Sequence, residues 1–207
     1  MNENKNPQFF ERIKVEIEEL REDLMGLPTS DFKTVGDFGC GWGYITSSLA
    51  QELPKSKCTG IDKFDPDDPP TLHTGFSIEN IRDLYMKIDV ENHPDFRQGN
   101  IVSGENIPYG FNLIYCKRVM YNIFLKGGEK ELSQAINHIT RALVPSGWIC
   151  LVDIYEPQFK AFLEEILFQA NFAFTPARCF YRPYNTLFKS YDTYPYLIYH
   201  CQKKEVL

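Results

Sequence analysis

The hydrophobic positions of the chain first recur at helical spacing, between residues 7 and 25. Steps of three and four residues put these positions on one face of a helix, and Glu and Arg fill the opposite face. The apolar residues are Phe9, Phe10, Ile13, Ile17, Leu20 and Leu24. Gly26 and Pro28 then predict the end of this leading helix.

Beyond it, short apolar runs alternate with further helical patterns as far as residue 170. The runs predict strands at 32–38, 57–61, 95–100, 111–116 and 148–154, and the helical patterns predict helices at 45–53, 77–88, 132–143 and 159–170. Strands that alternate with helices form a mostly parallel sheet. Two last β-type runs, 172–181 and 194–201, lack a helix between them and predict an antiparallel C-terminal hairpin. We therefore expect an α/β fold with a seven-stranded, mostly parallel sheet and helices on both faces.

A glycine cluster follows the first predicted strand and opens the next helix. Asp37 stands two residues ahead of Gly39, Gly41 and Gly43. Glycines let the backbone turn sharply and approach a ligand, which then faces the free N–H groups of the helix N-terminus. A phosphate-binding P-loop would need Gly-Lys-Ser/Thr here, and a dinucleotide fingerprint would need glycine at Tyr44. Asp37 would repel a pyrophosphate and attract an ammonium group, whereas a tight turn without a ligand is the remaining alternative.

Asp62 ends the second predicted strand, 62 − 37 = 25 residues after Asp37. A carboxylate at this place can accept hydrogen bonds from the two hydroxyls of a ribose. The same acid occurs in NAD enzymes, so it indicates an adenosine ligand without choosing between cofactors. The alternative is an aspartate of a solvent-exposed loop.

The order of these motifs resembles the class I S-adenosylmethionine-dependent methyltransferases, over about residues 32–202. The resemblance implies a Rossmann-like methyltransferase fold, S-adenosylmethionine as cofactor and S-adenosylhomocysteine as product. It places Asp37 at the amino-acid end of the cofactor and wraps the glycine loop around the methionine part. The cofactor-binding residues that it implies are Asp37, Gly39, Cys40, Gly41, Gly43, Asp62, Lys63, Asn100, Ile101 and Cys116.

Two positions depart from the family pattern. Asn100 stands where members usually carry the acid that accepts from the adenine amine, and Asn112 stands where they often carry Asp. An Asn side-chain oxygen still accepts from an amine, and the N–H of Ile101 can serve the neighbouring ring nitrogen. By the same resemblance, residues 1–207 form a single domain in which 1–27 are an N-terminal helix expected to cover the active site.

The loop after the fourth predicted strand, residues 116–122, lies where open α/β sheets bind ligands. Tyr121 and Asn122 are the catalytic candidates because they can orient a methyl acceptor. Arg118 can pair with an anionic acceptor, and Asp153, with Glu156 beside it, can hold a cationic or hydroxyl-bearing one. The alternative is that Arg118 and its neighbour Lys117 are solvated and Tyr121 caps the core.

The C-terminal segment, residues 181–199, contains a cluster of tyrosines for which two roles remain open. Six tyrosines stand at 181, 184, 191, 194, 196 and 199. Most fit core or edge packing of the last strands. Some could instead line an aromatic acceptor pocket with Phe9 or Phe10.

The composition and net charge limit the classes of binding partner that we expect. The formal charge is 22 − 28 = −6 with a pI near 5.3, which disfavours nucleic acid. No apolar run approaches the roughly 20 residues that span a bilayer, so we expect no membrane partner. Six separate cysteines predict reduced thiols and a cytoplasmic protein, and the four histidines share no metal-ligand spacing.

These observations predict methyl transfer to a small-molecule or protein acceptor by in-line displacement. A catalytically silent, cofactor-binding regulatory or scaffold protein of the same fold is the alternative. An NAD-dependent oxidoreductase is disfavoured by Tyr44. The acceptor, the methylated atom and the oligomeric state are not assigned by the sequence.

Overall fold

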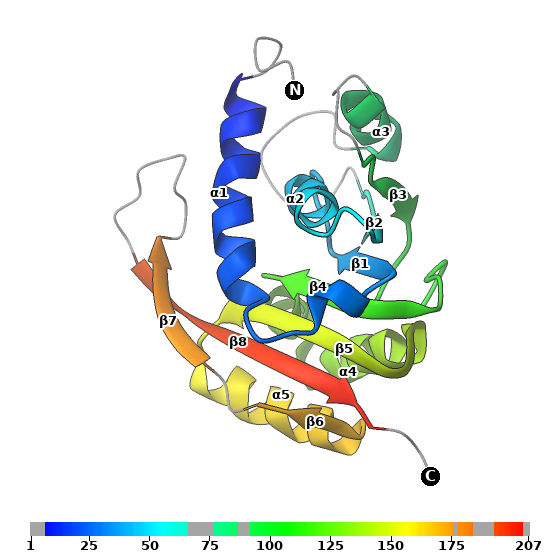
Figure 1. Cartoon of the computed structure of the whole chain (residues 1–207). Coiled ribbons are helices and arrows are strands. Elements are labelled where there is room, and N and C mark those ends of the chain that lie inside the picture. Colours follow the sequence, from blue (N-terminus) through cyan, green and yellow to red (C-terminus); the bar gives the residue numbers. More distant parts are fainter. Residues whose placement is uncertain (1–6, 66–76, 87–91, 176–177, 184–192, 205–207) are drawn as a thin grey trace.

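The structure is a computed structural model, and it describes residues 7–65, 77–86, 92–175, 178–183 and 193–204. Five parallel strands form the centre of the sheet, in the order β3-β2-β1-β4-β5 (Figure 1). They are β1 (Thr34–Phe38), β2 (Lys57–Asp62), β3 (Asp95–Gln98), β4 (Phe111–Lys117) and β5 (Leu143–Ile154). The chain reverses its winding between β1 and β4, and ligands of open α/β sheets bind at such a switch point.

The C-terminal strands extend the sheet in the antiparallel sense. β8 (Thr193–Lys203) pairs with β5 along one edge, and β6 (Phe172–Phe174) and β7 (Arg178–Pro183) follow one another along its other edge. Within the described residues the sheet therefore has eight strands in seven positions, which confirms the predicted mostly parallel sheet with its antiparallel C-terminal hairpin. The predicted strand 172–181 was wrong as a single element, and Pro176, which has no N–H for a ladder, lies in the sequence between its two parts.

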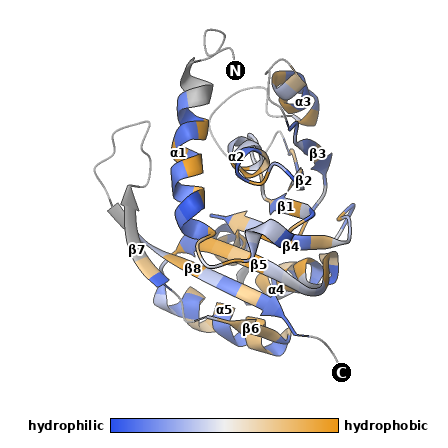
Figure 2. Cartoon of the chain, viewed as in Figure 1, coloured by the Kyte–Doolittle hydropathy of each residue, from blue (hydrophilic) through white to orange (hydrophobic). Residues whose placement is uncertain are grey.

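Helices cover both faces. α1 (Pro7–Asp23) and α2 (Tyr44–Glu52) pack on one face with Val35, Leu113 and Cys58, and α3 (Ile78–Met86) packs nearby against β3. α4 (Met120–Ala142) and α5 (Pro157–Gln169) pack on the other face with Phe38 and Ile114. A short 3-10 helix, η2 (Thr29–Asp31), leads into β1. Figure 2 shows the central parts of β4 and β5 as hydrophobic and the edge strand β3 as hydrophilic.

The connection between β3 and β4 contains no helix. Residues 99–110 form turns, with a single bridge between Asn100 and Glu105. At the end of this connection the Asn112 side chain accepts hydrogen bonds from the backbone N–H groups of Lys33 and Thr34, both at 3.0 Å. Asn112 therefore ties the amino-terminal ends of β1 and β4 together, at the opposite edge of the sheet from the glycine loop.

The start of α4 differs from the prediction, which placed residues 116–122 in a loop. The helix begins at Met120, so Tyr121 and Asn122 lie in its first turn. Asp153 of β5 accepts a hydrogen bond from the N–H of Tyr121 at 3.1 Å and so caps the helix from a neighbouring strand. Gly128, at φ 65° and ψ −157°, then breaks α4 before the predicted helical stripe continues to Ala142.

Glu156 stands immediately before α5 and binds the first backbone N–H groups of that helix. Its carboxylate accepts from the N–H groups of Gln158 and Phe159, at 3.0 and 2.6 Å, so it is the N-cap of α5 rather than a group aimed at an acceptor. We expect Glu156→Ala to lower the free energy of unfolding by about 1 kcal/mol because two N–H groups lose their partner. Urea denaturation measures this. Gln158→Ala, which truncates an exposed side chain of the same turn, is the control and should change little.

Candidate active site at the carboxyl ends of the strands

The glycine loop turns sharply between β1 and α2. Gly39, Gly41 and Gly43 all have positive φ angles, from 52° to 80°. A Cβ at Gly39 would clash with Val119, and one at Gly43 would lie 2.6 Å from the ring of Phe96. The N–H groups of Gly39 and Cys40 both point to the carbonyl of Ile61, at 2.7 and 3.1 Å. The loop is therefore held against the end of β2 and leads its backbone directly into a helix N-terminus.

Asp37 lies beneath this loop and is 1% exposed. The hydroxyl of Thr46 in α2 donates to its carboxylate at 2.7 Å. Burial raises the pKa of the Asp37 carboxyl to about 7, although the Thr46 hydrogen bond opposes this rise. A buried carboxylate of this kind is stabilised by a cation brought close to it.

Asp62 holds the other side of the loop. One of its oxygens accepts from the N–H of Gly41 at 2.9 Å, and the other from the N–H of Phe64 at 3.3 Å. Burial raises the pKa of Asp62, and these backbone donors oppose the rise. The predicted exposed-loop alternative does not describe this residue, because its carboxylate is half-buried and fixes the glycine loop.

The end of β3 lies beside Asp62, since the N–H of Gly99 donates to the Asp62 carbonyl at 2.9 Å. The side-chain oxygen of Asn100 already accepts from the N–H groups of Val102 and Ser103, at 2.9 and 3.3 Å. The expected role of that oxygen as acceptor for an adenine amine competes with this turn. Ile101 is buried beside it, and Lys63 is exposed at the end of β2.

Two cysteines of the predicted cofactor site are buried. Cys40 is 6% and Cys116 1% exposed, and burial raises the pKa of both thiols well above the usual value. Cys116 lies in the apolar cluster with Phe38 and Met120, so its side chain serves packing. All cysteines of the described residues are free thiols, and no group of three or more metal-ligating side chains occurs within those residues.

α1 is fastened to the end of β4 by a buried ion-pair network. Lys117 contacts Glu16 at 2.6 Å and Glu19 at 2.5 Å, and Glu16 also pairs with Arg12. Burial lowers the pKa of Lys117, but the two glutamates outweigh it and hold that pKa above its usual value. The alternative that Lys117 is solvated is therefore wrong, since its side chain is 3% exposed.

α1 also lies against the glycine loop. Ile13 packs in one cluster with Cys40, with Trp42 at its margin, and the carbonyl of Ile13 accepts from Ser48 of α2. Residues 13–19 thus reach the carboxyl ends of both β1 and β4. The side chains of Phe9 and Phe10, expected as a pocket wall, lie outside the described residues.

Most of the side chains predicted to hold the methyl acceptor instead contact neighbouring parts of the fold. Asp153, 3% exposed, caps α4, and burial raises its pKa to about 6. Asn122 is exposed and donates to the carbonyl of Arg118 at 2.7 Å. Tyr121 packs edge-on against Phe159, with ring centroids 5.3 Å apart, as the core-capping alternative predicts. The Arg118 guanidinium lies 5.4 Å from the ring centre of Tyr196.

Comparison with known proteins decides the fold. The sequence matches no known family profile and no curated protein sequence. Its structure superposes on the mitomycin 7-O-methyltransferase MmcR with a TM-score of 0.64 at 13% identity, over 91% of this chain and 54% of MmcR. A methyltransferase from Methanosarcina mazei gives 0.64 at 15% identity, over 86% and 94% of the two chains. Magnesium protoporphyrin IX methyltransferase (ChlM) from Synechocystis PCC 6803, with bound SAH, gives 0.62 at 15%, over 94% and 86%.

The chain has the class I methyltransferase fold. This confirms the fold that the motif order implied, and this chain spans about half of the length of MmcR. Within that fold the structure brings together Asp37, the glycine loop and Asp62, and the network of α1 with Lys117 adjoins them. The buried position of Lys117 was not predicted from the sequence. The available signal was a lysine at the end of an apolar strand and two glutamates three residues apart on the leading helix.

The C-terminal tyrosines divide between core and undescribed positions. Tyr196 and Tyr199 are 0% and 1% exposed. Tyr199 donates to Glu164 of α5 at 2.9 Å. These two belong to the packing of β8, as the packing interpretation predicts. Tyr184 and Tyr191 lie outside the described residues, and so do the side chains of Tyr181 and Tyr194.

Proposed function

We propose that the protein binds S-adenosylmethionine at the glycine loop and transfers its methyl group to a small-molecule or protein acceptor. The observation that carries the proposal is the pair of carboxylates, Asp37 and Asp62, on either side of a loop with three positive-φ glycines. Bound S-adenosylmethionine supplies an electrophilic methyl group on a sulfonium. Asp37 would face the ammonium group of the cofactor, and Asp62 would accept from the ribose hydroxyls.

The remaining residues of the predicted cofactor site would complete its contacts. Gly39, Cys40, Gly41 and Gly43 would line the methionine part, with Lys63 and Cys116 at its borders. The Ile101 N–H would serve the adenine edge, and Asn100 would offer its amide nitrogen because its oxygen holds a turn. We also propose that α1 is a fixed cover of the site rather than a mobile lid, given its buried ion pairs with Lys117.

Ligand-induced stabilisation tests the cofactor. Saturating S-adenosylhomocysteine should raise the thermal midpoint, because a ligand that binds only the folded state stabilises it by a few kcal/mol. NAD should leave the midpoint unchanged. Stabilisation by NAD but not by S-adenosylhomocysteine would refute the cofactor assignment.

The ribose role of Asp62 has its own test. We expect Asp62→Asn to weaken S-adenosylhomocysteine binding about tenfold or more in isothermal titration calorimetry, because hydrogen bonds to a charged acceptor are lost. Asp83→Asn, on the exposed face of α3, is the matched control and should bind like the parent protein. An unchanged affinity of Asp62→Asn would contradict the role.

The catalytically silent alternative rests on a separate observation. Asp153 and Asn122 both use their polar atoms on the backbone near α4. Incubation with methyl-labelled S-adenosylmethionine and fractionated cell extract distinguishes the two functions. Label in a small-molecule or protein fraction, lost in Asp37→Asn, supports transfer. Binding without incorporation in any fraction supports the silent protein.

A further inference from the structure

A second hollow opens at the opposite end of the sheet from the glycine loop. Its volume is about 120 Å³, which is smaller than the pockets that enclose a drug-sized ligand. Thr34, Lys57 and Phe111, the first residues of β1, β2 and β4, take part in its lining. Thr34 and Phe38 are four residues apart in β1, so the hollow lies roughly 13 Å from the glycine loop. It is therefore distinct from the proposed methyl-transfer site.

The hollow exists because, among the described residues, no helix covers β1, β2 and β3 near Thr34 and Thr59, on the face that α4 and α5 cover elsewhere. Thr34, Thr59 and Arg97 lie on the same face as Phe38 and Ile61, which pack toward α4 and α5. The helix-free connection of residues 99–110 borders β1, β2 and β3 on this side. Consistent with an open face, the positions that would be apolar under a helix are Lys57, Thr59 and Arg97.

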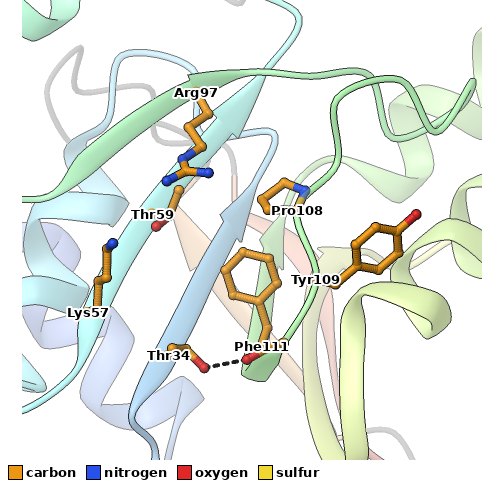
Figure 3. A pocket seen from close by; sticks show the side chains of 8 residues that line it. Thr34, Lys57, Thr59, Arg97, Pro108, Tyr109 and Phe111 are labelled. Atoms are coloured by element: carbon orange, nitrogen blue, oxygen red, sulfur yellow. Dashed lines mark hydrogen bonds between the residues drawn. The ribbon is translucent and has the colours of Figure 1, made fainter.

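Thr59 is the polar group at the bottom of this hollow. Its residue is 5% exposed, and its hydroxyl has no hydrogen-bond partner within the part of the chain that the structure describes. Figure 3 shows the hydroxyl pointing into the space between Lys57 and Arg97. This hydroxyl is accessible from the hollow, so a bound ligand can take its hydrogen bond.

Two cations flank that hydroxyl. The Lys57 amine and the Arg97 guanidinium project toward the same space (Figure 3). The Nε–H of Arg97 donates to the Asp95 carboxylate at 2.9 Å, and the two terminal nitrogens of the Arg97 guanidinium extend toward Thr59. This leaves one positive charge in excess over Asp95, in a chain whose net charge is −6. A fork of N–H donors beside a hydroxyl and an amine suits a tetrahedral oxyanion.

The opposite wall is apolar. Phe111 and Pro108 face the cations across the hollow, and Phe111 is fixed edge-on by Phe38 with ring centroids 5.5 Å apart. The Thr34 hydroxyl donates to the Gly110 carbonyl at 2.6 Å, which holds this wall against β1. The wall is thus a rigid apolar surface that a flat substituent can cover.

We propose that this hollow binds a small phosphate monoester with a flat apolar substituent. Thr59, Lys57 and Arg97 hold the phosphate, and the substituent lies on Pro108 and Phe111. The site binds its ligand independently of the cofactor, because it lies at the amino-terminal ends of β1, β2 and β4, whereas Asp37 and Asp62 lie at the carboxyl ends of their strands.

Titration of the full chain with phenyl phosphate, followed by ¹H–¹⁵N NMR, tests the proposal. We expect saturable shifts of the amides of Thr59, Arg97 and Gly110. Thr59→Val, which keeps the shape and strand propensity, should weaken binding about fivefold, and Arg97→Gln about tenfold. Arg141→Gln, an exposed arginine of α4, is the control and should bind within about twofold of the parent.

The remaining measurements separate this site from the methyl-transfer site. S-adenosylhomocysteine should bind Thr59→Val and Arg97→Gln as it binds the parent, and it should not displace phenyl phosphate. Displacement would overturn the proposal, as would equal affinity for inorganic phosphate and phenyl phosphate, which would leave the apolar wall without a role. Shifts that do not saturate, or an unchanged affinity of Thr59→Val, would overturn it as well.

Discussion

At pH 8 the Asp37→Asn variant should be more stable than the parent protein and yet bind S-adenosylhomocysteine about a hundredfold less tightly. Both effects have one cause, the buried charge. The asparagine oxygen can still accept the hydrogen bond that Thr46 gives to Asp37 at 2.7 Å, so the local geometry is kept. What disappears is a carboxylate that lies away from water and, in the proposed function, attracts the ammonium group of the cofactor.

The sign of the stability effect follows from the pKa of Asp37. Burial raises that pKa to about 7 in the folded protein, against about 3.9 in the unfolded chain. Between these values the folded state binds the extra proton, so stability falls as pH rises from about 4 to about 7. Above pH 7 the ionised group costs about 4 kcal/mol, and Asp37→Asn should regain about 2–4 kcal/mol. At pH 4 the variant and the parent should differ little.

The pH dependence of binding is the second readout of this prediction. Below pH 7 the parent must release a proton from Asp37 when the ammonium group binds, so its affinity should fall by up to about tenfold per pH unit. Calorimetry in buffers of different ionisation enthalpy measures that proton. Asp37→Asn should show no such release, and Asp83→Asn should behave as the parent. Equal pH profiles of parent and Asp37→Asn would contradict the assignment of Asp37.

The fold and the glycine loop could be predicted because local signals agree with the tertiary structure. Gly39 and Gly43 mark backbone that only glycine tolerates, Asp37 is the next-to-last residue of β1, and Asp62 ends β2. Such signals depend on residues that are near in sequence. The C-terminal hairpin was predicted for the same reason, as two β-type runs without an intervening helix.

Interactions between distant residues could not be predicted in this way. The helical start at Tyr121 depends on Asp153, 32 residues later, and the turn at Asn100 depends on its own side chain rather than on a ligand. The second hollow depends on the absence of a helix after β3, which shows in the sequence only as polar residues on one side of two strands. These features result from which elements meet in space, and no local pattern encodes that.

The Lys117→Met variant should lose about 3–5 kcal/mol of stability, the largest loss we expect from a single substitution in this chain. Lys117 joins β4 to α1 over about 100 residues of sequence, through Glu16 and Glu19. Methionine fills a similar volume, so packing is kept. Glu16 is nevertheless left buried, and Glu19 half-buried, beside an apolar side chain, and an uncompensated buried charge costs far more than a surface ion pair gains. Chemical denaturation of both proteins at pH 7 measures the loss.

A second substitution at Glu16 distinguishes the loss of charge pairing from the loss of side-chain packing in Lys117→Met. Adding Glu16→Gln to Lys117→Met should restore at least about 1 kcal/mol, because it removes one of the stranded carboxylates, although Arg12 still faces that position. Lys160→Met is the control, since its pair with Glu164 is about one third exposed on both sides and should be worth under about 1 kcal/mol. If the double variant were less stable than Lys117→Met, the loss would come from the shape of the side chain. The ion pairs would then not be what fastens α1 over the glycine loop.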